Sequence, residues 1–121
     1  MTGGNTVEII GRDPAKAHAL AAARDGASVG TSPTGDLVIV AVPYASAVMV
    51  VSEYGDALTG KVIVDITNPI TPDLAGFLTP EGSSGAQEIA KAAPTGTHVV
   101  KAFNTLPCDV LAAGPVHGRP V

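Results

Sequence analysis

The sequence is poor in the residues from which many functional sites are built. Its 121 residues include one cysteine, no tryptophan, two tyrosines and two phenylalanines. A single cysteine, Cys108, excludes an internal disulfide and any metal site made of several thiolates. The three histidines, at positions 18, 98 and 117, lack the spacing of a zinc site. We therefore expect no metal centre, and we interpret Cys108 as a buried or incidental thiol.

Basic clusters and long apolar runs are also missing. The seven Lys and Arg residues are scattered and the net charge is −4, which argues against a nucleic-acid-binding surface. The longest apolar run, residues 37–51, is interrupted by Pro43, Tyr44 and Ser46 and is short for a membrane span. The N-terminus lacks the pattern of a secretory signal. These absences predict a cytoplasmic protein with no nucleic-acid or membrane partner.

Common catalytic motifs are absent as well. The chain contains neither a Gly-x-Ser-x-Gly nucleophile elbow nor a phosphate-binding P-loop string. We identify no pair of side chains with the arrangement of a nucleophile and its base. The sequence therefore predicts no catalytic side chain of its own.

What the sequence does contain is an alternation of apolar strands and alanine-rich helices. Hydrophobic residues make up 45% of the chain, which is enough for a packed core. Strands are predicted at 7–10, 27–29, 37–42, 62–66 and 98–102, and helices at 15–24, 45–58, 84–93 and after Pro107. Continuous apolar, β-branched strands are typical of a parallel sheet buried on both faces. This order predicts an α/β fold with a mainly parallel sheet and flanking helices.

Ligands of such sheets bind beyond the carboxyl ends of the strands. Four of these ends carry turn-forming and hydrogen-bonding residues, namely residues 11–12, 43–44, 67–69 and 103–105. We expect them to line one crevice.

Two cations follow the first strand. Arg12 stands just after it, and Lys16 lies one helical turn further on, so both can face one spot. In dinucleotide-binding folds an arginine at this position can pair with the 2′-phosphate of NADP. The spacing alone favours the simpler alternative, a solvated pair beside a helix that Asp13 caps.

Two further residues have more than one interpretation. Asp65 lies inside an apolar strand, where a carboxylate must be hydrogen-bonded or near water; bonds from nearby loop amides are the simpler explanation. Phe103 suits a pocket wall, although core packing is the default for an aromatic residue.

Four segments, taken in order, resemble the NADP-dependent oxidoreductases that use the deazaflavin coenzyme F-420. They are Gly11 to Ala17, Asp36 to Tyr44, Val64 to Pro69 and Val99 to Thr105. The resemblance implies a Rossmann-like fold over residues 1–121, as a single partial NADP-binding domain. It also implies direct hydride transfer between nicotinamide and deazaflavin, with the protein mainly aligning the two.

The resemblance assigns a role to each candidate residue. Arg12, with Lys16 in support and Gly11 beside it, would hold the 2′-phosphate and select NADP over NAD. The nicotinamide side would be formed by Val42 and Pro43 along the ribose, Asn68 and Pro69 at the nicotinamide, and Ala102, Phe103, Asn104 and Thr105 around the acceptor site.

The chain also departs from the family pattern. Family members have a strand, a glycine-rich phosphate loop and a helix before the segment that matches Val7, and further strands and helices after Val121. The connection at residues 31–35 is shorter than the family's. The absent first strand would lie between the strands at Val7 and Leu37 and would leave two apolar edges unpaired. We expect direct pairing of these edges, a partner chain in the gap, or a true start upstream of Met1, and we favour a truncated reading frame.

These observations leave three hypotheses. The first is an NADP(H)-dependent oxidoreductase, intact or shortened, that transfers hydride to a deazaflavin or flavin-type acceptor; the shortened chain is expected to bind NADPH poorly. The second is a non-catalytic fragment that assembles with another chain, or as a homo-oligomer, through its exposed strand edges. The third is a small α/β binding protein with no nucleotide.

Overall fold

The computed structural model describes residues 4–71, 73–106 and 108–113. Within these ranges the order of elements is β1 (Val7–Ile9), α1 (Pro14–Ala22), β2 (Ala27–Val29), β3 (Leu37–Val40), α2 (Tyr44–Tyr54), the short 3-10 helix η1 (Gly55–Leu58), β4 (Val62–Asp65), α3 (Gly85–Ala92), β5 (His98–Lys101) and α4 (Cys108–Ala113). The predicted alternation is confirmed, although several strands end one or two residues earlier than expected. His117 and Pro107 lie outside the described residues.

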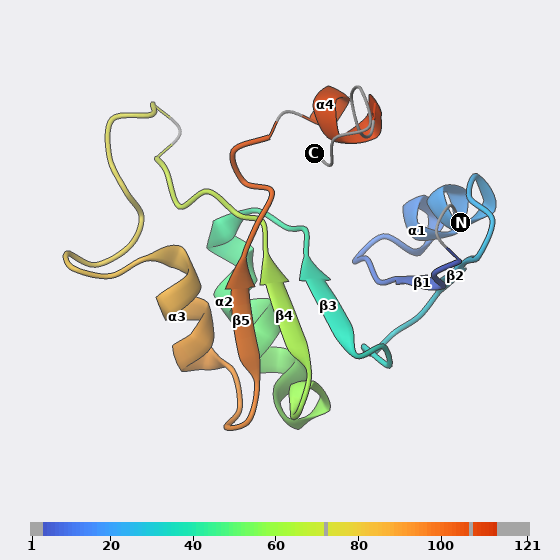
Figure 1. Cartoon of the computed structure of the whole chain (residues 1–121), viewed down its shortest axis with the longest axis horizontal. Helices are drawn as coiled ribbons and strands as arrows, with labels where there is room; N and C mark the ends of the chain where they lie inside the picture. Colours follow the sequence, from blue (N-terminus) through green and yellow to red (C-terminus); the bar gives the residue numbers. More distant parts are fainter. Residues whose placement is uncertain (1–3, 72, 107, 114–121) are drawn as a thin grey trace.

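The strands form two parallel sheets (Figure 1). In the smaller sheet β1 pairs with β2, and Val7 lies opposite Ala27. In the larger sheet β4 lies between β3 and β5, with Leu37 and His98 both opposite Val62. The fold class is therefore α/β with parallel sheets flanked by helices, as the sequence predicts.

Polar side chains cap two of the helices. The Asp13 carboxylate accepts from the backbone N–H of Ala15 at 3.0 Å and of Lys16 at 3.4 Å, and so begins α1. Ser84 Oγ accepts from the N–H of Gln87 at 3.2 Å at the start of α3. Each cap satisfies a donor that the first turn of a helix leaves unpaired.

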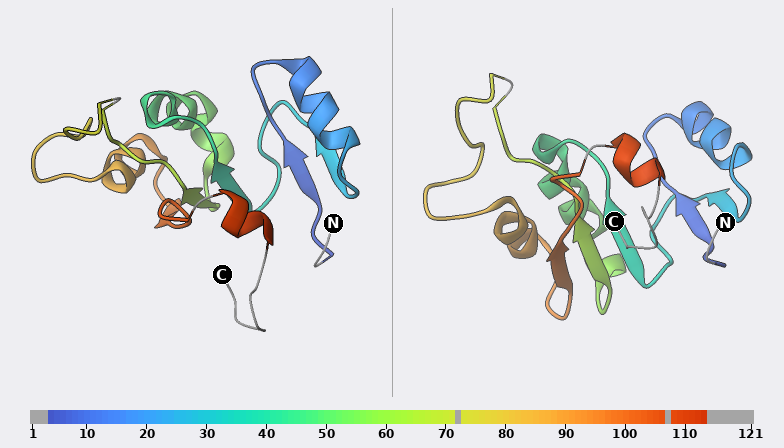
Figure 2. Two further views of the ribbon diagram at one scale, coloured as in Figure 1. Left: turned by 90° about the horizontal axis from the view of Figure 1, so that it is seen from above. Right: turned by 45° about the horizontal axis from the view of Figure 1, so that its top comes forward.

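The hydrophobic core lies between the larger sheet and the helices α2 and α3, which cover one of its faces (Figure 2). Its buried members are Val40, Ala47, Val51, Leu58, Ile63 and Ile89. Side chains alternate across a strand, so the other face carries Leu37, Ile39 and Val100, which are about half exposed.

The sheet differs from the single one expected, because no backbone hydrogen bond joins β1 to β3 among the described residues. The connection between the two sheets is instead tied to both of them. The Glu8 carboxylate accepts from Thr34 N at 3.1 Å and Thr34 Oγ1 at 3.2 Å. Lys61 Nζ donates to the carbonyls of Thr34 at 3.3 Å and Gly35 at 2.7 Å. Direct pairing of the two strand edges, one of the three outcomes expected, is not found.

Candidate cofactor-binding site

A cavity of about 510 Å³ opens at the carboxyl ends of β3 and β4. It is lined by residues 41–45, residues 66–68, Ile70 and Leu78. Val42, Pro43 and Asn68 therefore line the same cavity, at the ends of two strands that the sequence predicts to share one crevice. The volume is within the usual range for small-molecule sites, and most of the lining is apolar.

Pro43 shapes this wall because it joins the strand to the helix. Proline has no N–H to continue the ladder, and its fixed φ suits the start of a helix. Its carbonyl accepts from Ser46 N at 2.9 Å and Ala47 N at 3.2 Å. Tyr44, the first residue of α2, is thereby placed in the cavity lining.

The phenol of Tyr44 has an altered acidity. Burial raises the pKa of Tyr44 above its ordinary value, and the negative charges of Glu88 and Asp65 raise it further. The phenol therefore stays neutral at physiological pH and keeps its hydrogen-bond donor.

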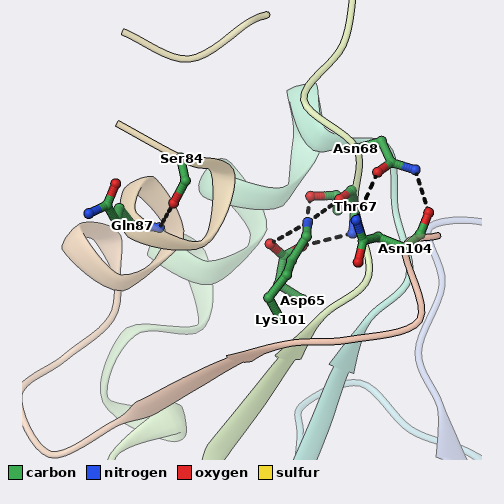
Figure 3. A network of polar contacts seen from close by, with 7 residues as sticks. All are labelled: Asp65, Thr67, Asn68, Ser84, Gln87, Lys101 and Asn104. Atoms are coloured by element: carbon green, nitrogen blue, oxygen red, sulfur yellow. Dashed lines mark hydrogen bonds and ion pairs between the residues drawn. The ribbon is translucent and has the colours of Figure 1, made fainter. Parts of the chain in front are cut away.

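A buried ion pair fixes the ends of β4 and β5 (Figure 3). Asp65 is completely buried, and its Oδ1 accepts from Thr67 N at 2.8 Å and Thr67 Oγ1 at 2.7 Å. Its Oδ2 accepts from Lys101 Nζ at 3.0 Å, and Lys101 also donates to the Thr67 carbonyl. The expected loop amide is confirmed as a partner of Asp65.

The role of Lys101 was not predicted from the sequence. The register pairs Asp65 with Lys101 at the last position of the ladder. Two opposite charges at the ends of adjacent apolar strands were the signal that could have identified the pair.

Two asparagines connect the loops that follow these strands (Figure 3). Asn68 Nδ2 donates to the Asn104 carbonyl at 3.0 Å, and Asn104 Nδ2 donates to Asn68 Oδ1 at 3.3 Å. Asn104 is thereby brought to the edge of the cavity that Asn68 lines. The pair provides amide groups of the kind that recognise a carboxamide or a ribose hydroxyl.

Phe103 is not a core residue, so that interpretation is wrong. Its side chain is about half exposed, and its φ of 63° lies in the left-handed region that bulky residues rarely adopt. The turn that it begins is closed by a bond from Leu106 N to the Phe103 carbonyl at 3.2 Å. Strain of this kind is concentrated at functional sites in proteins.

A second cavity of about 460 Å³ lies at the start of α3. Pro69 and Lys101 line it together with Phe77 and residues 79–86. Asn68 and Pro69, expected to border the same region, therefore belong to two different cavities. Ala102, Phe103 and Thr105 line neither of them.

The phosphate side of the expected site lies on the smaller sheet. Gly11, Arg12 and Lys16 are exposed near the carboxyl end of β1 and the beginning of α1. They line neither cavity. The structure thus brings together Val42, Pro43, Asn68 and Asn104, and places the two cations apart from them, where a helix N-terminus also attracts anions.

The described residues also bear on a metal centre, a membrane span and Cys108. They contain no group of three or more metal-ligating side chains, and no helix in them is long and apolar enough to span a membrane. Cys108 is exposed and not buried, so of the two interpretations, a buried or an incidental thiol, the incidental one stands.

Comparisons with known proteins identify one similar solved structure and the family of the chain. The chain is similar to the crystal structure of a hypothetical protein, SMa0349, from Sinorhizobium meliloti, with 31% identity and a TM-score of 0.80. The match covers 93% of this chain and 57% of that one, so the chain spans just over half the length of its relative. No curated protein matches. One family model matches residues 2–69, which is more than half of the sequence, and the chain therefore belongs to the family described as NADP oxidoreductase, coenzyme F420-dependent.

Proposed function

We propose that the chain binds NADP(H) across the carboxyl ends of β1, β3 and β4 and presents the nicotinamide to a deazaflavin or flavin-type hydride acceptor. The observation that carries this proposal is the cavity of about 510 Å³ beside the bonded pair Asn68 and Asn104. It combines a mainly apolar wall, suited to a flat ring, with amide groups that fix the orientation of the ring.

Each part of the wall has a distinct task. Val42 and Pro43 exclude water along the ribose and one face of the ring. Asn68, held by Asn104, offers a donor and an acceptor to the carboxamide. Reduced nicotinamide supplies the hydride when bound, so the protein's task is alignment, and effective alignment contributes several kcal/mol to such reactions.

The hydride passes directly between the two cofactors, and solvent supplies the proton that the acceptor also takes up, so no side chain of this wall is required to move a proton. Asp65 is fully occupied by Thr67 and Lys101, and its task is to hold the loop of Asn68 at the end of β4. This agrees with a reaction in which the cofactors carry the electrons.

Arg12 and Lys16 would select the cofactor. Both are exposed near the N-terminus of α1, where the unpaired N–H groups of the first turn add to the attraction for an anion. An arginine can bind a phosphate through two parallel hydrogen bonds. We therefore assign the 2′-phosphate of NADP(H) to this position.

The two halves of the site are tested separately by NMR titration of the isotope-labelled chain. Nicotinamide mononucleotide is expected to shift the amides of residues 41–45 and 66–68, and adenosine 2′-monophosphate those of residues 12–16. NADPH is expected to shift both sets. Shifts confined to residues 79–86, at the second cavity, would place the ligand elsewhere and contradict the proposal.

The reaction itself is tested by following the absorbance of NADPH with a deazaflavin acceptor. The proposal expects NADPH to be consumed in proportion to the reduced acceptor, and Asn68→Ala to slow this. The control is Asn5→Ala, which changes an exposed asparagine that lines neither cavity. Binding of NADPH without hydride transfer to deazaflavin or flavin would contradict the proposed reaction. The proposed binding of NADP(H) would still stand.

A further inference from the structure

The second cavity, of about 460 Å³, has no part in the proposed function. It is formed by Pro69 after β4, the loop before α3, the first residues of α3 and Lys101 at the end of β5 (Figure 3). None of Val42, Pro43 and Asn68 lines it. It is large enough for a small molecule, so the chemistry of its lining indicates what it binds.

The beginning of α3 contributes two backbone donors to this lining. The N–H of Gln87 is bonded to Ser84 Oγ, and the N–H of Glu88 to the Ser84 carbonyl at 3.0 Å. The N–H groups of Gly85 and Ala86, which line the cavity, have no acceptor among the described residues. Gly85 is buried, where an unpaired donor is costly. Two adjacent donors at a helix N-terminus attract an anion.

A close packing contact holds these donors in place. A Cβ at Gly85 would lie 3.3 Å from Pro69 Cγ and 3.4 Å from Tyr44 Cε2, so glycine lets α3 begin here without displacing its neighbours. Pro69 lines the same cavity. The N-terminus of α3 and one apolar wall of the cavity are therefore fixed relative to each other.

Ser83 adds a third donor, on a side chain. The residue lines the cavity, and its Oγ is buried without a hydrogen-bond partner in the part of the chain that the structure describes. Its backbone is fixed, because Ser83 N donates to the Pro80 carbonyl at 3.1 Å in the turn before α3. A buried hydroxyl without a partner costs free energy, and an acceptor bound in the cavity would remove that cost.

Lys101 supplies positive charge to the same cavity. Its ammonium donates to Asp65 Oδ2 and to the Thr67 carbonyl, which uses two of its three donors. Asp65 is fully buried and lines neither cavity, whereas the Lys101 side chain is 31% exposed, so the ion pair has its positive end toward the cavity. Glu81 also lines the cavity but is exposed, so water and salt weaken its repulsion of an anion.

The rest of the lining is mostly apolar. Phe77 contributes an aromatic ring, and Pro69 and Pro80 contribute two further apolar surfaces. The Phe77 side chain is 75% exposed, so a ligand in the cavity has apolar surface to cover. An inorganic ion gains nothing from such walls, whereas an organic molecule gains free energy for each apolar group that it buries.

From these features we propose that the second cavity is a binding site for a small organic carboxylate with an apolar body. The carboxylate accepts hydrogen bonds from the N–H groups of Gly85 and Ala86 and from Ser83 Oγ. The ammonium of Lys101 stabilises its charge, and the ring of Phe77 covers the apolar body. The site is separate from the cavity proposed for nicotinamide, so it does not depend on binding of NADP(H).

The first experiment compares three ligands on the isotope-labelled, unchanged chain by NMR. The probes are benzoate, benzamide and inorganic phosphate, at constant pH and ionic strength. Benzamide has nearly the shape of benzoate without its charge, and phosphate has charge without an apolar body. We expect benzoate to shift the amide protons of Gly85 and Ala86 in a saturable way. We expect the other two ligands to bind these amides at least about tenfold more weakly.

Three results of this titration would overturn the proposal. Equal affinity for benzoate and benzamide would show that the start of α3 recognises no charge. Phosphate binding as tight as that of benzoate would show a site for a bare anion. A titration in which benzoate causes no saturable shift at Gly85 and Ala86 would show that the cavity takes no carboxylate.

The second experiment removes the hydroxyl of Ser83. Ser83→Ala is expected to weaken benzoate binding about three- to tenfold, because one hydrogen bond to the carboxylate is lost. The matched control is Ser52→Ala, which changes an exposed serine of α2 that lines neither cavity. It is expected to leave benzoate binding unchanged. Equal affinity for benzoate in Ser83→Ala and in the unchanged chain would refute the placement of the carboxylate, and with it the proposal.

The apolar wall is tested with Phe77→Ala, a change at an exposed side chain. We expect benzoate to bind about fivefold or more weakly, because the variant buries less of its ring, and acetate to bind as it does to the unchanged chain. An equal loss of affinity for benzoate and acetate would overturn the assignment of Phe77 to the apolar body. All of these titrations are made without NADPH, so their failure is distinct from failure of the proposed function.

Discussion

At the scale of single residues, Asp65 shows how an apolar strand accommodates a charge. The carboxylate is fully buried, yet it accepts three hydrogen bonds, two from Thr67 and one from Lys101. The sequence predicts that Asp65 needs partners, because an unpaired buried carboxylate is too costly. Lys101 could not be assigned as that partner, since it lies 36 residues away and the pairing depends on the strand register.

Replacing Lys101 with methionine is expected to destabilise the protein. The substitution preserves the aliphatic chain and leaves the Asp65 carboxylate buried without its cation. Breaking a buried pair costs about 3–5 kcal/mol, and we expect about 3 kcal/mol because the Lys101 side chain is 31% exposed. Urea unfolding measures this change.

The control for this experiment is Lys91→Met. Lys91 Nζ lies 3.4 Å from Glu88 Oε2, but the Lys91 side chain is 67% exposed. Exposed pairs contribute at most about 1 kcal/mol, so the control is expected to lose less than that. Equal losses in the free energy of unfolding of Lys101→Met and Lys91→Met would show that burial of Asp65 does not determine the stability of this region.

Tyr44 offers a second test at this scale. Burial and the charges of Glu88 and Asp65 raise the pKa of Tyr44 above its ordinary value of 10.0. Replacing Glu88 with glutamine removes a negative charge that disfavours the phenolate, so the pKa of Tyr44 is expected to fall. Ultraviolet titration in a Tyr54→Phe background reports Tyr44 alone.

Glu53→Gln is the matched control, because the charge of Glu53 raises the pKa of Tyr54 and not that of Tyr44. A pKa of Tyr44 that does not respond to Glu88→Gln would contradict the electrostatic coupling between Glu88 and Tyr44.

At the scale of elements, local signals explain most of what the sequence predicts correctly. Asp13 with Pro14, and Ser84, mark the beginnings of α1 and α3 as expected. Helix caps depend on residues within three positions of one another, so they can be identified from sequence alone. The left-handed backbone of Phe103 could not be predicted, because a bulky residue adopts it only under constraints from distant chain.

Two neighbouring serines at the start of α3 are expected to behave in opposite ways. Ser84→Ala removes the cap on Gln87 N and is expected to cost about 1 kcal/mol. Ser83 Oγ is buried and has no hydrogen-bond partner among the described residues, so Ser83→Ala removes an unsatisfied hydroxyl and is expected to be neutral or stabilising. Thermal unfolding measures the stability of the two variants. A larger loss of stability in Ser83→Ala than in Ser84→Ala would contradict the assignment of Ser84 as the helix cap.

At the scale of the whole molecule, the sequence predicts the order of strands and helices but not how the sheet is divided. The apolar pattern identifies each strand, and the carboxyl ends identify the cavity with Val42, Pro43 and Asn68. Pairing between strands is a long-range property that hydrophobicity does not encode. Only the structure shows that β1 and β3 stay apart and that Arg12 lies on a different sheet from the cavity.

The central claim is that this chain recognises NADP(H) through the 2′-phosphate at Arg12. The most direct measurement is a calorimetric comparison of NADPH and NADH binding to the unchanged chain, to Arg12→Ala and to Arg24→Ala. Arg24 is the control, because in the part of the chain that the structure describes its Nη1 bonds only the adjacent Ala23 carbonyl, at 3.1 Å, near the other end of α1.

Even where the affinity itself is low, a charge-assisted contact predicts that NADPH binds about ten- to a hundredfold more tightly than NADH. The account predicts this preference in the unchanged chain and in Arg24→Ala, and its loss in Arg12→Ala. Equal affinity for NADPH and NADH in the unchanged chain, or a preference that survives in Arg12→Ala, would contradict it.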